Sequence, residues 1–370
     1  MGRSYLLWMG FLATVMAVGY SVHMLDFPAG LSRDVSWGLH IAQFTFFVGV
    51  AASALMVVLP YYIHNMKEFG RITLLGEFLA VTAVTVCLLF IVVDLGMPHR
   101  IWNVVFYPTP NSPLFWDVVV LNGYILINLV LGWKMLEAEH QGAPPPFWTK
   151  WVMYASLPWA VSIHAVTAFI YAGLPGRDLW LTALLAPKFL ASAFAAGPAL
   201  LILLCAILKR TARFDVGAAA IDKLSVVVMY ATITVTIMQV SEFFTSFYAG
   251  IPAHMHSLQY LFFGLDGHHA LTPLMWIYVV LLITALAILI RPKLRNDEQT
   301  RLIGCAAVFF AMMIEKGLAL TVAGFIPNPF GRVTEYVPTW SELVVMLGVW
   351  ATGAFLISLF YRLVISVKEG

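Results

Sequence analysis

The feature that most constrains this chain is a series of ten apolar runs, each long enough to cross a lipid bilayer. A helix needs about 20 predominantly apolar residues to span the hydrocarbon core. Backbone groups in lipid must be satisfied within the element, and the sequence lacks the alternation of barrel strands, so the runs predict helices. The expected fold class is all-α, a polytopic integral membrane protein with ten transmembrane helices. The runs cover residues 4–25, 36–63, 71–94, 114–136, 151–173, 187–208, 222–248, 272–290, 301–324 and 341–365.

The composition fits a surface that faces lipid. Hydrophobic residues make up 61% of the chain and charged residues 11%, whereas soluble domains carry about 25% charged residues. The net charge of +2 and the lack of a basic tract give no reason to expect a nucleic-acid partner, so the lipid membrane is the expected surrounding. Residues 4–25 lack the short apolar core and the Ala-x-Ala-like site of a cleavable signal peptide, so we expect them to form the first span.

The three cysteines, Cys87, Cys205 and Cys305, each stand alone inside an apolar run, without Cys-x-x-Cys spacing. This pattern argues against an iron–sulfur cluster, a structural zinc site or a disulfide framework within the chain. We expect all three to be small core residues.

The loops between the runs differ in charge. Because basic residues mark cytoplasmic loops, the bias predicts a protein of the cell (cytoplasmic) membrane with both termini in the cytoplasm. Most histidines and several carboxylates fall at the outer face, where we therefore expect the titratable chemistry. Fifteen Lys and Arg residues lie on the cytoplasmic side, and the outer side holds five, namely Arg33, Arg100, Arg177, Lys188 and Arg332.

A short internal repeat suggests how the helices are grouped. Residues 112–116 (SPLFW) open the fourth run and residues 272–276 (TPLMW) open the eighth, and small residues recur in the second and sixth runs. An offset of four helices preserves orientation, as in parallel membrane repeats. The expectation is a single membrane domain, 1–370, with one four-helix bundle over 36–173 (helices two to five) and another over 187–324 (helices six to nine). Helices one and ten would flank them.

Titratable residues occur inside these runs, where a charge costs roughly 2.5–3.5 kcal/mol on insertion scales. Interhelical hydrogen bonding accounts for single Ser or Thr residues, but it does not require titratable groups. A functional pocket is therefore expected in the outer half of helices two to five, lined by His40, Asp117, Tyr124 and His164. Deeper residues suggest either mutual neutralisation of Glu315 and Lys316 or a proton route. The residues assigned to that route are Glu77, Glu242, Glu315, Lys316 and Glu335.

An ordered series of motifs across about residues 36–350 resembles the NrfD/polysulfide reductase membrane-subunit family. The number of runs and the Ser-Ile-His segment look most like its ten-helix subgroup, which includes the DsrP, HmcC and ActC types, with the DsrP type nearest. The motifs are residues 37–42 (WGLHIA), 94–100 (DLGMPHR), 112–117 (SPLFWD), 158–164 (PWAVSIH), 259–264 (QYLFFG) and 335–339 (EYVPT).

The resemblance implies a chain without haem, iron–sulfur cluster or metal that binds a quinone, with menaquinone expected, near the outer face. It implies electron exchange with a ferredoxin-like iron–sulfur subunit docked there, alongside a multihaem cytochrome c and further membrane subunits. The chain would be the quinone-oxidoreductase subunit of such a complex and not an enzyme alone. Residues 331–333 (GRV) depart from the family, where an acidic residue is expected after the glycine. The expected quinone-binding residues are His40, Gln43, Asp94, Asp117, Tyr124 and His164.

Two other functions remain open from the sequence. A secondary transporter or proton channel is compatible with the repeat, although most prolines lie at the ends of the runs and only Pro158 and Pro198 lie inside them. A b-type cytochrome would need axial histidines, for which only His40 and His164 lie within the membrane.

Overall fold

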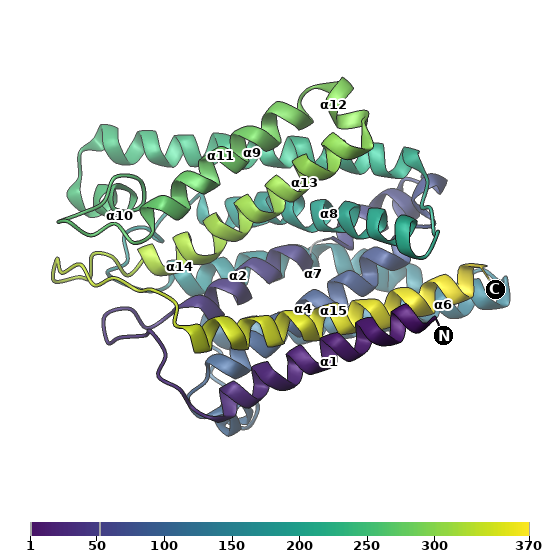
Figure 1. Ribbon diagram of the computed structural model, residues 1–370, viewed down its shortest axis with the longest axis horizontal. Coiled ribbons are helices and arrows are strands. Elements are labelled where there is room, and N and C mark those ends of the chain that lie inside the picture. The colour runs from purple at the N-terminus through teal and green to yellow at the C-terminus, as the bar shows by residue number, and fades with distance from the viewer. Residues whose placement is uncertain (1, 52, 370) are drawn as a thin grey trace.

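The computed structural model describes residues 2–51 and 53–369. Within them it is helical and strand-free, with ten helical segments long and apolar enough to span a membrane, which confirms the all-α polytopic prediction (Figure 1). The spans are α1 (Arg3–Met24), α2 (Leu39–Ala51) continued by α3 (Leu55–Val58) and η1 (Leu59–Ile63), α4 (Thr73–Asp94), α6 (Pro113–Gln141), α7 (Trp148–Ala172), α8 (Leu185–Thr211), α9 (Ala218–Ala249), α11 (Thr272–Leu289), α13 (Glu298–Met312) continued by η4 (Met313–Ala319) and α14 (Leu320–Ala323), and α15 (Trp340–Glu369).

Several helix ends follow from local sequence. Proline lies in the first turn of α6 and α11, where the missing N–H costs nothing. Gly142 and Gly250 end α6 and α9 in the left-handed conformation that glycine adopts without strain. Short elements outside the spans are η2 (Lys67–Phe69), η3 (Pro98–Trp102), α5 (Asn103–Phe106), α10 (Pro252–Phe262) and α12 (Pro292–Asn296).

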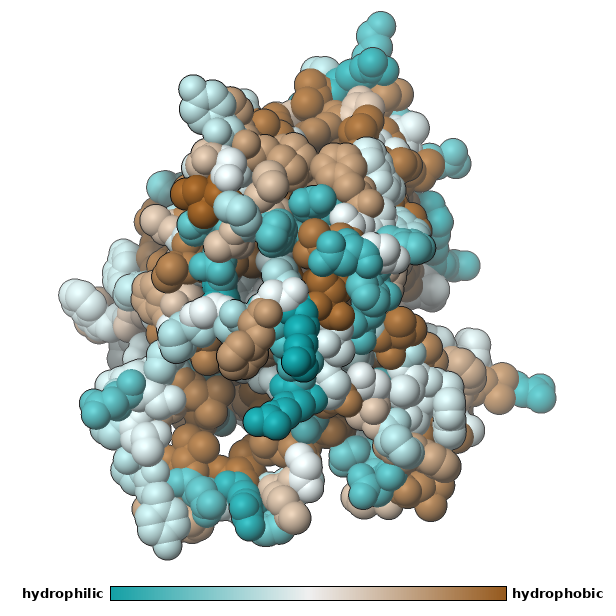
Figure 2. All heavy atoms as spheres, turned by 90° about the vertical axis from the view of Figure 1, so that its left-hand side faces the viewer, coloured by the Kyte–Doolittle hydropathy of each residue, from teal (hydrophilic) through white to brown (hydrophobic). Residues whose placement is uncertain are grey.

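Both chain termini lie at the same end of the bundle (Figure 1). We call this the terminus end, and we call the opposite end, where α2 begins, the histidine end. Figure 2 looks onto the histidine end, where hydrophilic and hydrophobic residues are interspersed. A hollow opens in the lower half of that view, the half that holds α1 and α15 in Figure 1.

The helix contacts form two groups. In the first, α2 contacts α4, α4 contacts α6, α6 contacts α7 and α7 returns to α2; in the second, α8, α9, α11 and α13 contact one another in the same cyclic way. The helices α1 and α15 lie against each other, and α15 also lies against α4. Two four-helix units would make these contacts, and the division into bundles over 36–173 and 187–324 remains a prediction.

The small residues of the second and sixth runs lie where α2 approaches α8. A Cβ atom added to Gly197 would lie 2.9 Å from the Ser53 nitrogen and 3.0 Å from the Val50 carbonyl oxygen. Glycine is therefore required for this close approach, as is common at contacts between membrane helices. Ala52, part of the same small-residue run, lies outside the described residues.

Candidate functional site

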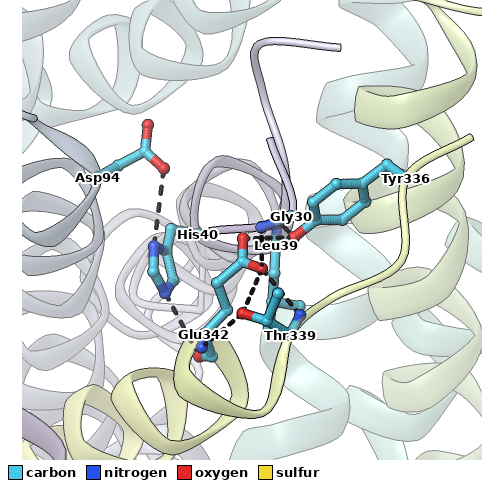
Figure 3. Close-up of polar contacts among 7 residues, drawn as sticks. All are labelled: Gly30, Leu39, His40, Asp94, Tyr336, Thr339 and Glu342. Atoms are coloured by element: carbon cyan, nitrogen blue, oxygen red, sulfur yellow. Dashed lines mark hydrogen bonds and ion pairs between the residues drawn. The ribbon is translucent and has the colours of Figure 1, made fainter. Parts of the chain in front are cut away.

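The first titratable group at the histidine end is a pair formed by His40 near the start of α2 and Asp94 at the end of α4. The His40 Nδ1 atom lies 3.7 Å from an Asp94 carboxylate oxygen, and Nε2 lies 3.4 Å from the carbonyl oxygen of Glu342 (Figure 3). The His40 residue is 8% exposed, whereas the Asp94 side chain is 17% exposed. The imidazole is thus buried, with a carboxylate between it and the end of the bundle.

Glu342 and Tyr336 hold this region together, although the sequence did not single them out as site residues. The Glu342 carboxylate accepts hydrogen bonds from the Tyr336 hydroxyl at 2.7 Å, the Gly30 N–H at 3.0 Å, and both the N–H and the hydroxyl of Thr339 at 2.8 and 2.9 Å (Figure 3). The Tyr336 hydroxyl also accepts the Leu39 N–H at 2.8 Å. Because the Glu342 carbonyl faces His40, this network fixes one neighbour of the imidazole.

A sequence signal for these residues existed. A carboxylate in the first turn of an apolar span needs partners, and Glu342 occupies that position in α15. Tyr336 lies within the motif 335–339 that carried part of the family resemblance.

Aromatic side chains surround the imidazole on its inner side. The Phe90 ring is stacked with His40 at a centroid distance of 6.4 Å, and Phe47 is stacked with Phe90 at 6.1 Å. The indole N–H of Trp350 donates to the side-chain oxygen of Gln43 at 3.2 Å, and its ring meets Phe47 edge-on. The group therefore combines one imidazole, one amide and flat apolar surfaces. His40, Gln43 and Asp94, three of the six expected quinone-binding residues, lie in it.

The other three residues have different neighbours. Asp117 accepts the Thr167 hydroxyl at 2.6 Å between α6 and α7. The Tyr124 hydroxyl donates to the Ala51 carbonyl at 3.3 Å. His164 is 1% exposed, and neither ring nitrogen has a hydrogen-bond partner among the described residues. Within the described part of the chain, no hydrogen bond of these three residues joins them to His40, and a pocket lined by His40, Asp117, Tyr124 and His164 remains a prediction.

The sequence counted Lys188 among the five basic residues of the outer side, but the structure shows it buried within a span instead of exposed in a loop. Lys188 lies in the first turn of α8 and is 7% exposed. Its ammonium group lies 2.6 Å from Glu315, 2.9 Å from Glu242 and 2.7 Å from the side-chain oxygen of Gln239. The run at 187–208 gave no sign of these partners, because they lie on α9 and η4.

Lys188, and not Lys316, is the partner of Glu315. The Lys316 ammonium instead donates to the Phe189 carbonyl at 3.2 Å and lies 4.3 Å above the centre of the Phe189 ring. Mutual neutralisation of Glu315 and Lys316, one of the two alternatives that the sequence left open, is therefore not the pairing that the structure shows. The two consecutive side chains of η4 contact different groups.

The two remaining residues assigned to a proton route, Glu77 and Glu335, have different environments. Glu77 on α4 is fully buried, and neither of its oxygens has a partner within the described part of the chain. Glu335 lies in the loop before α15, where it accepts the Ala270 N–H at 2.6 Å and faces His268 at 3.3 Å. Partial burial opposes its ionisation, but these donors outweigh that effect and hold the pKa of Glu335 below its ordinary value.

Across residues 2–51 and 53–369, no group of three His, Cys, Asp or Glu side chains is arranged to hold a metal ion. The expected lack of haem and metal remains a prediction, to be tested by composition.

Comparison with known proteins identifies the family. The family model for polysulphide reductase, NrfD, matches residues 29–326. The chain is 27% identical over 237 residues to a subunit of the selenate reductase of Mesobacillus selenatarsenatis, covering 55% of this chain and 56% of that protein. It is 27% identical over 194 residues to the Hdr-like menaquinol oxidoreductase integral membrane subunit of Archaeoglobus fulgidus, covering 52% and 48%.

The chain spans about half the length of the curated relatives it matches. The match to the family model, by contrast, begins before α2 and ends just after α14. It therefore includes His40, Asp94 and the Lys188 group, by which we mean Lys188 with Glu242, Glu315 and Gln239. It stops short of Tyr336 and Glu342. On this extended match, the chain belongs to the NrfD polysulphide reductase family.

Proposed function

We propose that this chain is the quinone-interacting membrane subunit of a respiratory redox complex, exchanging electrons between a membrane quinone and an iron–sulfur partner subunit. The observation that carries the proposal is the buried His40–Asp94 pair beside Phe47, Phe90 and Trp350 at the histidine end. The name of the Archaeoglobus relative includes menaquinol, which supports menaquinone as the quinone. The ten spans and the motif series support the ten-helix, DsrP-type subgroup.

The residues around His40 fit a quinone head group in their chemistry. A quinone carbonyl requires a hydrogen-bond donor, and its ring requires flat apolar surfaces. His40 and Gln43 supply nitrogen donors, and Phe47 and Phe90 supply the surfaces. The separation of 3.7 Å between Nδ1 and Asp94 exceeds a hydrogen-bond length, so the imidazole is not committed to that carboxylate.

A bound quinol supplies two electrons together with two protons. In the proposed function His40 receives a proton at its ring, since imidazole changes charge near neutral pH. Asp94, more exposed than His40 and facing Nδ1, stabilises the imidazolium and accepts the proton for release at the histidine end. The Glu342 carbonyl keeps the ring oriented throughout.

The proposed orientation places the histidine end outside the cytoplasm. Its loops carry Arg33, Arg100, Arg177 and Arg332, while the terminus end carries fifteen basic residues. An iron–sulfur subunit would then dock at the face shown in Figure 2. A multihaem cytochrome c and further membrane subunits would complete the complex.

A route for protons from the terminus end would use Glu77 and, across the bundle, Glu242, Glu315 and Lys316. The buried Glu77 carboxyl, with no fixed partner among the described residues, is suited to carry a proton. The Glu335 carboxylate instead contacts Tyr260, the Ala270 N–H and His268. Its bonds to the 268–270 segment suit it better to ordering the outer loops.

The test is His40→Ala in the assembled complex, with Asp94→Asn as a second variant. Loss of one hydrogen bond typically costs about 0.5–1.5 kcal/mol, which is roughly a 2- to 13-fold effect, so quinol-dependent electron transfer should fall by about that factor. Quinone retained by the purified complex should fall with it. The matched control is His99→Ala, an exposed histidine at the same end, which should keep wild-type activity.

Full quinol activity and full quinone content in both His40→Ala and His164→Ala would refute a site in helices two to five. The pocket would then have to lie near Glu242 in the second group of helices. A Soret band in the purified chain would favour the cytochrome alternative instead.

A further inference from the structure

The Lys188 group is built like a binding site. Three ionisable side chains and one amide converge there from α8, α9 and η4, and Lys188 and Glu315 are 7% and 5% exposed. A cavity of about 30 Å³ adjoins them, lined on its other sides by leucines, Met275 and Ala319. This is enough space for a water molecule.

The position of the group in the chain repeats that of the His40–Asp94 pair. Lys188 follows His40 by 148 residues, and Glu242 follows Asp94 by the same 148 residues. Gly197, at the contact between α2 and α8, likewise follows Gly49 by 148. In both groups a base near the start of one span thus faces a carboxylate late in the next span.

The second group differs from the first in its charge. Lys188 contributes one positive charge, while Glu242 and Glu315 contribute two negative charges when both are ionised. An uncompensated charge in a low-dielectric interior is strongly unfavourable. The group becomes neutral when one carboxyl carries a proton, and Lys188 lies within 3 Å of both carboxylates.

The hydroxyl group of Tyr278 is a further buried polar group near Lys188, Glu242 and Glu315. Tyr278 on α11 is 1% exposed, and its hydroxyl has no partner among the described residues. It lies near enough to Lys188, Glu242 and Glu315 to interact with them electrostatically. A hydroxyl of this kind can donate to an ionised carboxylate or accept from a protonated one through a water molecule.

We propose that Lys188, Glu242 and Glu315 form a proton-binding site that shares one exchangeable proton between its two carboxyl groups. It is the counterpart, in helices six to nine, of the His40–Asp94 pair. Binding forms an O–H bond on one carboxylate with a proton that arrives from bulk solvent as hydronium, whose own O–H bond breaks to leave water; release reverses both changes, and no electrons are transferred.

Lys316 links this site to the first group of helices. It follows Glu315 directly on η4, a π-helical segment of the kind often found at functional sites. Its ammonium lies 3.1 Å from where a Cβ on Gly49 would be, and it is close enough to His164 to act on it electrostatically. The inference rests on the proposed function only for this link, because the site itself needs no quinone.

Infrared spectroscopy of the full chain, purified and stripped of quinone, tests the proposal. Protonated and ionised carboxyl groups absorb at different frequencies. Glu242→Gln and Glu315→Gln should each remove one protonated-carboxyl band, because the remaining carboxylate pairs with Lys188 and ionises. The matched control, the exposed Glu137→Gln, should remove only an ionised-carboxylate band.

Loss of an ionised-carboxylate band alone in Glu242→Gln or in Glu315→Gln would overturn the proposal. If these variants do not fold, Tyr278→Phe, which keeps every charge, replaces them. It should shift the protonated-carboxyl band of the site, and an unshifted spectrum would overturn the proposal as well. His40→Ala should leave the band intact even if it abolishes quinol activity, so failure of the quinone site and failure of this site give different results.

Discussion

Tyr336 joins the start of α2 to the start of α15, because its hydroxyl donates to Glu342 at 2.7 Å while accepting the Leu39 N–H at 2.8 Å. The ring also fills the space over Gly38, where a Cβ atom would lie 2.5 Å from it. Glu342, at one end of this contact, also places its backbone carbonyl 3.4 Å from the His40 Nε2 atom, and Leu39, at the other end, precedes His40 directly. The geometry of the site therefore depends on a residue outside it.

We predict that Tyr336→Phe destabilises the protein and loosens the His40 region. The change leaves a buried N–H and a buried carboxylate oxygen short of a partner, at a cost of about 1–3 kcal/mol. The melting temperature in detergent and the quinone affinity should both fall. Tyr107→Phe, at a 74% exposed tyrosine, should change neither. Equal behaviour of the two variants would remove Tyr336 from the framework of the site.

Gly197→Ala should separate α2 from α8. The new Cβ would meet backbone atoms of Ser53 and Val50 at about 3 Å, and backbone cannot yield as a side-chain end can. Overpacking of this kind costs about 1–3 kcal/mol. Gly10→Ala is the control, since no atom lies within 4 Å of its added Cβ. Thermal unfolding of both variants measures the difference, and equal melting temperatures would contradict the tight contact.

Orientation is testable because Cys87, Cys205 and Cys305 are all buried. Single cysteines introduced at the exposed Ala219 and Ala253 should therefore react over a low background. From the charge bias, an impermeant thiol reagent should label Ala253→Cys from outside intact cells and should reach Ala219→Cys only after lysis. The reverse pattern would invert every assignment of sides.

Asp34 should make the loops of the histidine end sensitive to acid. The Thr334 hydroxyl donates to its carboxylate at 2.9 Å and the Asn328 amide at 3.1 Å, and these bonds hold the pKa of Asp34 below its ordinary value. Because the unfolded loop binds the proton more readily, the bonds contribute fully above an ordinary pKa of about 4 and are lost as pH falls through the lower folded value.

Amide hydrogen exchange over residues 328–334 measures this effect. Protection should be greater in the wild type than in Asp34→Asn at neutral pH, and the difference should vanish in acid. If the difference in protection between wild type and Asp34→Asn persisted unchanged at low pH, its cause would be the altered packing of the side chain and not the ionisation of Asp34.

Glu77→Gln should slow turnover if Glu77 passes protons from the terminus end. The amide keeps the size of the buried carboxyl but cannot release a proton, so we expect a several-fold loss of quinol-dependent turnover with quinone content unchanged. Glu137→Gln, an exposed carboxylate near the terminus end, is the control. Wild-type turnover and proton stoichiometry in Glu77→Gln would exclude it from the route.

The sequence by itself determined the ten spans. Lipid imposes a length and an apolar composition on each helix, and both are local properties. The runs at 71–94 and 187–208, for example, correspond to α4 and α8 within a few residues. The sequence also singled out His40, Glu242 and Glu315 as titratable groups inside the spans, and the family resemblance added Asp94.

Only the tertiary structure decided which of these groups meet. Glu315 pairs with Lys188, 127 residues away, and not with its neighbour Lys316. His40 faces Asp94 and the backbone of Glu342, not Asp117. The physical reason is that a contact between spans depends on the depth and rotation of each helix. The depth and rotation of a helix are set by its packing against several neighbours at once, such as the glycine contact between α2 and α8. They cannot be read from the periodicity of a single helix.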